Sequence, residues 1–194
     1  MGDTTKTPGT LVTPRSPAAW RAWLQAHYSQ TAGIRLRLFK KDSGKQVLTY
    51  AQALDDALCF GWIDGQKNTY DAESWVQNFS PRRPRSAWSK INTAHAERLI
   101  QEGRMTPAGM AQVEAAKKDG RFETAYDSPS AATIPADFLA QLGKSKKAQA
   151  FFRTLDRANL FAIAYRLQTA KKPETRAKRM ALILQMMKDG RKFH

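Results

Sequence analysis

The chain has 194 residues, of which 42% are hydrophobic and 25% are charged, so it can bury a core as one domain or as two small ones. Lys and Arg number 32 against 17 Asp and Glu, which gives a formal net charge of +15. A positive field of this size favours phosphates, nucleic acid or acidic surfaces as partners. An open alternative is that the surplus of basic residues serves solubility alone.

Several classes of protein are excluded by what the chain lacks. No stretch approaches the roughly 20 apolar residues of a membrane helix, and the first residues lack the apolar segment of a secretory signal. We therefore expect no membrane insertion and a cytoplasmic location. Cys59 is the only cysteine, which rules out an internal disulfide and suits a reducing compartment. Residues 1–15 are polar and without periodicity, and we expect them to form a disordered, mobile tail.

The first structured part combines helices with strands. Ser16 followed by Pro17 predicts a helix start, and Trp20, Trp23 and Leu24 then share one helical face. The next predicted elements are a strand, a turn, a second helix and a hairpin, at residues 34–39, 42–44, 49–60, and 66–70 with 75–79. They predict a small antiparallel sheet with helices packed on it.

After Pro81 the hydrophobic periodicity is helical throughout. Helices are expected at residues 88–101, 106–119, 135–142, 145–155, 160–167 and 173–189. Residues 126–135 are rich in Ser, Pro and Ala and read as a linker. We therefore predict an α+β fold that is predominantly helical, with an N-terminal domain at residues 16–125 and a helical bundle at residues 136–194.

The motif FGWIDG places Trp62 and Asp64 between Gly61 and Gly65, where a predicted helix leads directly into a strand. Glycines allow a sharp bend or the close approach of a ligand, so both side chains are candidates for the rim of a binding cleft. The alternative is a helix stop followed by a core tryptophan. Asp64 is also the candidate general base if the protein is an enzyme.

The motif FSPRRPRSAWSK is the sharper candidate for anion binding. Pro81 and Pro84 restrict the backbone, so three neighbouring arginines are presented with little conformational entropy left to lose. Guanidinium groups bind oxyanions bidentately, and the start of the following helix would add backbone N–H groups. The alternative is that these arginines pair with the acidic residues between positions 42 and 73. The predicted ligand-binding set is Trp62, Asp64, Arg82, Arg83, Arg85, Trp88, Ser89 and Lys90.

A second basic cluster, KKPETRAKR, lies at the start of the last predicted helix and contains Lys172, Arg176 and Arg179. Positive charge at a helix N-terminus opposes the helix dipole, and a bound anion would compensate for it. The alternative is a solvated basic helix start.

No recognised cofactor or metal motif is present. The three histidines are far apart in sequence, no second cysteine exists, and zinc, dinucleotide, Walker and nucleophile-elbow patterns are all missing. We therefore expect no metal and no cofactor.

The chain resembles the YdeI/OmpD-associated family, described as bacteriocin-protection proteins. The resemblance runs along the chain through Trp23-Leu24 with His27, FKKDSGK, TYAQALDDALCFGWIDG, FSPRRPRSAWSKIN, RLIQEGRMTPAG and AKKPETRAKR. Where the family usually has a tryptophan in the first strand, this chain has Arg35. The resemblance implies a role in stress or resistance and supplies no catalytic residues. It also attributes an envelope location to some members, which the missing secretory signal argues against for this chain.

Three functions remain open from the sequence. The first is a cytoplasmic protein that binds a phosphate-bearing or other anionic ligand, including a nucleotide or nucleic acid. The second is an enzyme in which Asp64 acts as general base on an arginine-bound anionic substrate. The third is a protein-interaction module that acts as a homodimer.

Overall fold

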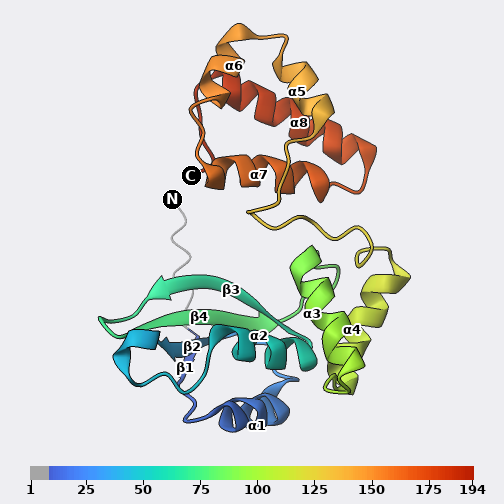
Figure 1. The fold of residues 1–194 in the computed structure, drawn as a ribbon. Coiled ribbons are helices and arrows are strands. Elements are labelled where there is room, and N and C mark those ends of the chain that lie inside the picture. Colours follow the sequence, from blue (N-terminus) through green and yellow to red (C-terminus); the bar gives the residue numbers. More distant parts are fainter. Residues whose placement is uncertain (1–8) are drawn as a thin grey trace. The chain divides into compact units, whose positions relative to one another are not determined.

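The computed structural model describes residues 9–194, which fall into two compact units (Figure 1). Unit 1 contains the described residues up to Ser86 together with Asn92–Glu123. Unit 2 contains Ala87–Ile91 and Thr124–His194. The N-terminal domain predicted at residues 16–125 includes residues 87–91, whereas the structure groups these residues with the second unit.

Unit 1 is built on a four-stranded sheet in the order β1-β2-β4-β3. Its strands are β1 (Thr10–Val12), β2 (Ile34–Phe39), β3 (Trp62–Thr69) and β4 (Ser74–Pro81). Strand β2 is antiparallel to β4, and β4 is antiparallel to β3, as the sequence predicts. Strand β3 begins at Trp62, earlier than predicted, and its register shifts between Asp64 and Lys67.

Strand β1 corrects the predicted mobile tail for part of its length. Residues 10–12 pair in parallel with β2, from Thr10 opposite Ile34 to Val12 opposite Leu36. These backbone hydrogen bonds order a segment whose side chains carry no hydrophobic pattern, which is why periodicity missed it. Residues 1–8 of the predicted tail lie outside the described residues.

Helices α1 (Pro17–His27) and α2 (Tyr50–Cys59) cover one face of this sheet (Figure 1). Each begins at the predicted cap: Ser16 accepts a hydrogen bond from the Ala19 amide, and Thr49 forms a capping box with Gln52. A single-turn 3-10 helix, η1 (Lys41–Ser43), occupies the predicted turn between β2 and α2.

Two further helices, α3 (Lys90–Gln101) and α4 (Pro107–Lys118), follow the sheet. Thr106 caps α4, as its position before a proline predicts. The sequence pattern for α3 runs from Trp88 and offers Ser89 or Asn92 as its cap, and the structure agrees with a start directly after Ser89, which forms an isolated parallel bridge with Tyr126. Helix α3 therefore begins at Lys90.

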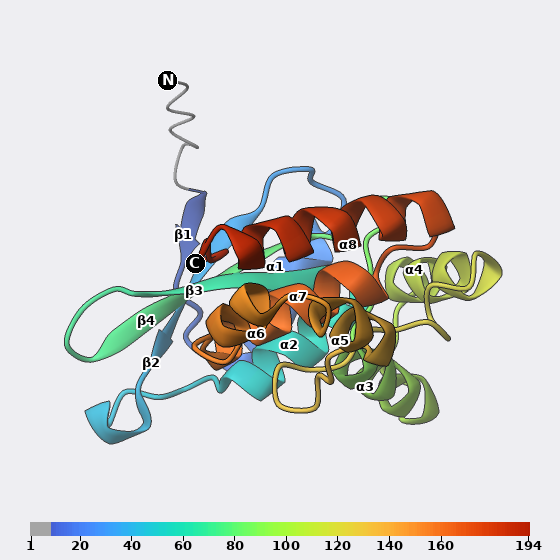
Figure 2. The same cartoon turned by 90° about the horizontal axis from the view of Figure 1, so that it is seen from above.

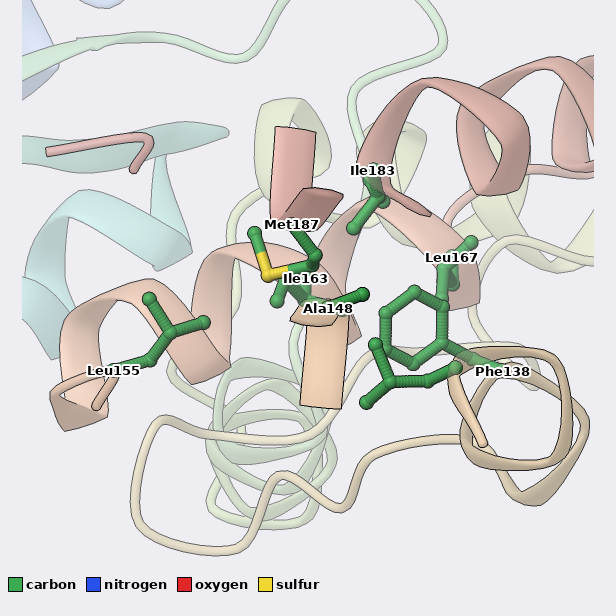
Figure 3. Packing of buried hydrophobic residues seen from close by; sticks show 8 residues of the cluster. Phe138, Ala148, Leu155, Ile163, Leu167, Ile183 and Met187 are labelled. Carbon is green, nitrogen blue, oxygen red and sulfur yellow. The ribbon is translucent and has the colours of Figure 1, made fainter. Parts of the chain in front are cut away.

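Unit 2 contains four helices, α5 (Ala136–Leu142), α6 (Lys146–Phe152), α7 (Arg157–Gln168) and α8 (Pro173–Lys188). Helix α8 packs against each of the other three (Figure 2). Their apolar faces share one core, which Figure 3 shows around Phe138, Ile163, Ile183 and Met187. The predicted class, a predominantly helical α+β fold with a helical C-terminal part, is confirmed.

Candidate functional site

The FGWIDG segment is a tight junction between α2 and β3. Gly61 has a φ of 76°, and a Cβ atom at this position would lie 3.0 Å from the carbonyl oxygen of Ala108. Gly109 is closer still, because a Cβ there would lie 2.3 Å from the Cys59 carbonyl oxygen. The glycines at 61 and 109 therefore allow α4 to approach the end of α2, which is a packing role.

The two predicted indoles are buried. Trp62 is 0% exposed, its ring N–H donates to the Tyr28 carbonyl at 3.0 Å, and its ring meets Trp23 edge-on at 5.8 Å. Trp88 is 2% exposed and belongs to unit 2. Neither indole offers an open face for a ligand to stack on, so we assign both to packing.

Asp64 is half-buried on β3 beside the register shift. One of its carboxylate oxygens accepts a hydrogen bond of 2.8 Å from the Tyr50 hydroxyl. Burial, and then the hydrogen bond to this carboxylate, raise the pKa of Tyr50 well above its ordinary value. The phenol therefore stays protonated at neutral pH and connects α2 to β3.

The arginine loop, residues 81–86, is anchored at both ends within unit 1. The backbone N–H of Arg82 donates to the Gly61 carbonyl at 3.0 Å, and the Arg82 side chain is buried. At the other end, the Arg121 guanidinium donates to the Ser86 carbonyl at 2.8 Å and is held by Asp119 at 2.7 Å. The tip of the loop is thus fixed from two sides.

The tip of the arginine loop carries two guanidinium groups with no partner in the protein. Arg85 has a φ of 63°, the only positive φ of a non-glycine residue among residues 9–194. The side chains of Arg83 and Arg85 are exposed, and within the described chain neither makes a hydrogen bond, an ion pair or a ring contact. The loop presents two solvated positive charges on a strained, anchored turn.

The other members of the predicted binding set lie in unit 2. Ser89 takes part in the bridge to Tyr126, and the Lys90 ammonium pairs with Asp127 at 2.7 Å. The charge of Lys90 is therefore compensated within the unit. The predicted set is divided between two units, and only Arg83 and Arg85 keep the properties expected of a ligand contact.

The second basic cluster contains three differently placed side chains. Lys172 precedes α8 and is exposed. Arg176 forms two hydrogen bonds with the carboxylate of Asp137, so its charge is paired. Arg179 instead donates to the Arg166 carbonyl at 2.7 Å and to the Thr169 hydroxyl at 3.3 Å.

A set of ion pairs that sequence analysis did not identify surrounds the end of α2. We call it the carboxylate cluster, and it consists of Asp55, Asp56, His95, Arg98, Arg21, Arg104 and Glu102. Asp55 accepts hydrogen bonds from His95 at 2.7 Å and from Arg98 at 2.6 Å. Asp56 pairs with Arg21 at 2.8 Å and with Arg104 at 3.3 Å.

The environment of the carboxylate cluster stabilises its ionised form. Burial raises the pKa of Asp55, but hydrogen bonds from His95 and Arg98 outweigh burial and hold that pKa below its ordinary value. Burial also raises the pKa of the Cys59 thiol, despite a hydrogen bond from Arg21, so the thiol is an inert core group. The only signal in the sequence was that Asp55 and Asp56 stand between the apolar pairs Ala53-Leu54 and Ala57-Leu58, and nothing in it names the cations that these carboxylates would need if buried.

Neither a metal-ligating cluster nor a membrane-spanning helix occurs in the part of the chain that the structure describes. Residues 9–194 contain no group of three or more His, Cys, Asp or Glu side chains that could hold a metal ion. None of the helices in that range combines the length and the apolar character needed to cross a bilayer.

Comparison with known proteins gives two family matches. Residues 12–112 match a domain of unknown function, DUF8412, and residues 131–190 match the family described as bacteriocin-protection, YdeI or OmpD-associated. The predicted resemblance is therefore confirmed over the C-terminal segment, whereas FGWIDG and the arginine loop fall within the other family model. Searches of curated proteins and of solved structures gave no match. Because the first match covers more than half of the chain, the protein belongs to the DUF8412 family and carries a C-terminal segment of the YdeI/OmpD-associated type.

Proposed function

We propose that the protein binds a phosphate-bearing polyanion, in the first place nucleic acid, through the arginine loop. The observation that carries this proposal is the pair of unpartnered guanidinium groups at Arg83 and Arg85 on a doubly anchored turn. An anchored arginine loses little conformational entropy when it contacts a phosphate, and its planar fork matches phosphate oxygens. The strain at Arg85 supports a role beyond packing.

The positive charge of the rest of the chain suggests that the ligand of the arginine loop is a long polyanion and not a single small anion. The formal net charge is +15, and unit 2 alone contains 15 of the 32 Lys and Arg residues but only 5 of the 17 Asp and Glu residues. A long polyanion releases counterions at each contact with such a surface. The arginine loop would give this general attraction a fixed point of contact.

Salt titration tests the proposal. Binding of fluorescently labelled single-stranded and duplex oligonucleotides would be followed by anisotropy between about 50 and 200 mM salt. We expect a steep fall of log affinity with log salt, and a slope shallower by about 1 to 2 for the double variant Arg83→Gln with Arg85→Asn. Asparagine tolerates the left-handed conformation at position 85, so this variant removes charge without adding strain.

Arg15→Gln is the matched control, because Arg15 is also exposed in unit 1 and makes no contact through its side chain within the described residues. The control should leave the slope nearly unchanged. If the control and the double variant made the salt slope shallower by the same amount, the attraction between protein and oligonucleotide would be diffuse. The proposal that the arginine loop binds nucleic acid would then fail.

Location and cellular role follow from this proposal. We place the protein in the cytoplasm, where nucleic acid is accessible, and the name of the family matched by residues 131–190 supports a role in stress or resistance. The enzyme alternative retains only its sequence argument, because the one hydrogen-bonding partner of the Asp64 side chain in the described residues is Tyr50.

A further inference from the structure

A cavity of about 430 Å³ lies within unit 2, between α7, α8 and the C-terminal segment. Tyr165, Arg166 and Thr169 of α7 line one side, and Arg179 and Ile183 of α8 line another. Pockets that bind small molecules usually have volumes of about 300 to 1,000 Å³ and combine apolar walls with a few placed polar groups. This cavity has both properties.

The two arginines of the cavity are oriented by backbone carbonyls. Arg179 donates through Nη1 to the carbonyl of Arg166 at 2.7 Å, and Arg166 donates through Nη1 to the carbonyl of Ala162 at 3.2 Å. Within residues 9–194, neither guanidinium has a carboxylate partner, and the Nε and Nη2 groups of both lack an acceptor. A carbonyl fixes the direction of an arginine but leaves its charge uncompensated.

Four of the five acidic residues of unit 2 are engaged away from the cavity, and the fifth, Glu174, does not line it. Asp127 pairs with Lys90, Asp137 with Arg176, and Asp189 with Arg191, while Asp156 caps α7. None of these carboxylates lines the cavity. An anionic ligand would therefore meet two positive charges there without competition from the protein.

The C-terminal segment completes the cavity with an aromatic wall. The fully buried Asn159 side chain accepts hydrogen bonds from the backbone amides of Phe193 at 2.9 Å and His194 at 3.3 Å. This places the Phe193 ring 4.0 Å from the guanidinium carbon of Arg166. Ile183, 1% exposed, adds an apolar surface, and Leu182, 58% exposed, lies at the rim.

We propose that this cavity binds a small organic phosphate, with Arg166 and Arg179 on the phosphate and the apolar body of the ligand against Phe193 and Ile183. The doubly positive, carboxylate-free lining favours a dianionic phosphate over a monoanionic carboxylate. The aromatic and aliphatic walls favour a substituted phosphate over the free ion. The proposal does not depend on the arginine loop, which lies in the other unit.

Calorimetric titration of the full chain with phenyl phosphate tests this site. We expect one binding event, with inorganic phosphate and benzoate each at least about tenfold weaker because each lacks one of the two features the cavity recognises. Arg179→Gln should weaken phenyl phosphate binding by about tenfold to a hundredfold, as expected for the loss of charged hydrogen bonds. Arg179→Lys keeps the positive charge but lacks the planar fork of the guanidinium, so its affinity for phenyl phosphate should lie between those of the unaltered protein and Arg179→Gln.

Arg176→Gln is the matched control, since it removes the same group from the same helix but from a position already paired with Asp137. It should bind phenyl phosphate as the unaltered protein does, and so should the loop variant Arg83→Gln with Arg85→Asn. A missing binding event, benzoate or inorganic phosphate as tight as phenyl phosphate, or equal losses in the variants at 176 and 179 would each overturn the proposal. If only the loop variant lost phenyl phosphate binding, the binding site would lie in unit 1, and the proposed site in unit 2 would be overturned as well.

Discussion

The carboxylate cluster of unit 1 and the cavity of unit 2 both gather arginines, but they hold them differently. In the carboxylate cluster, Arg21 and Arg98 donate directly to aspartate oxygens, at 2.8 and 2.6 Å. In the cavity, Arg166 and Arg179 donate to backbone carbonyls and meet no carboxylate within the described chain. The first arrangement neutralises charge and stabilises the fold, whereas the second leaves charge available for a ligand.

The arginines of this protein differ in whether they have a carboxylate partner. Arg176 and Arg179 are three residues apart on α8, yet Arg176 is paired with a carboxylate, whereas Arg179 bonds to a backbone carbonyl and keeps its charge available for a ligand. The charges of Arg83 and Arg85 are also available for a ligand, because no carboxylate of the described chain pairs with them. Four of the acidic residues that we considered as their partners instead pair with other cations, as Asp55 does with Arg98 and Asp71 with Arg37, while Asp64 bonds to the Tyr50 hydroxyl.

The largest expected effect comes from breaking the paired arrangement. Asp56→Ala leaves Arg21 and Arg104 without their shared carboxylate, and we expect the free energy of unfolding of unit 1 to fall by about 2 to 3 kcal/mol, less than for a fully buried pair because both arginines are partly exposed. Urea denaturation followed by tryptophan fluorescence measures the loss. Asp137→Ala, which breaks an exposed pair, should cost at most about 1 kcal/mol. Equal effects of the two variants would remove the distinction.

The pH dependence of stability tests the same cluster. The folded pKa of Asp55 lies below its unfolded value, so its contribution is fully present above the ordinary carboxyl pKa of about 3.9 and is lost as pH falls through the folded pKa. The stability gap between the unaltered protein and Asp55→Asn should therefore narrow on acidification below about pH 4. Denaturant midpoints measured across this range would show it. A gap that widens on acidification would contradict the assigned direction.

A smaller effect, of opposite sign, is expected at the arginine loop. Arg85→Gly relieves the left-handed conformation and should raise the free energy of unfolding by about 0.5 to 1 kcal/mol while weakening oligonucleotide binding. Arg85→Ala also removes the guanidinium but keeps the strain, so its stability should stay close to that of the unaltered protein. Thermal unfolding of the two variants measures the difference. A less stable glycine variant would show that the turn carries no strain.

The smallest effect is expected in the cavity. Arg166→Gln removes a charge with no carboxylate partner, so the free energy of unfolding should change by no more than about 0.5 kcal/mol, although the ring contact with Phe193 is lost. Circular dichroism during thermal unfolding reports on this helical unit. A loss comparable to that of Asp56→Ala would place Arg166 among the structural arginines.

Local signals in the sequence predicted much of the fold. Ser16 and Thr49 cap helices because their side chains satisfy amides of the first turn, which is a property of neighbouring residues. The pairing of Arg21 with Asp56, 35 residues apart, depends on how α1 meets α2 and has no signature in either segment. For the same reason Trp62 looked like a ligand contact, although its surroundings make it a core residue.

The site was only partly predictable for a related reason. Proline spacing identified the arginine loop, but the positive φ of Arg85 and its anchoring by Arg121 follow from tertiary contacts. Arg166 lies on an amphipathic helix and carries no motif at all. Its place in the cavity lining depends on α8 and the C-terminal segment, which supply the other walls.

An NMR titration that observes the Nε–H groups of the arginines while phenyl phosphate is added to the full chain distinguishes the paired arginines from those that lack a carboxylate. We expect the resonances of Arg166 and Arg179 to shift in a saturable way, while those of Arg21, Arg98 and Arg176 stay in place. Saturable shifts at these three paired arginines, with Arg166 and Arg179 unmoved, would contradict the claim that the partner of a guanidinium decides whether it binds a ligand.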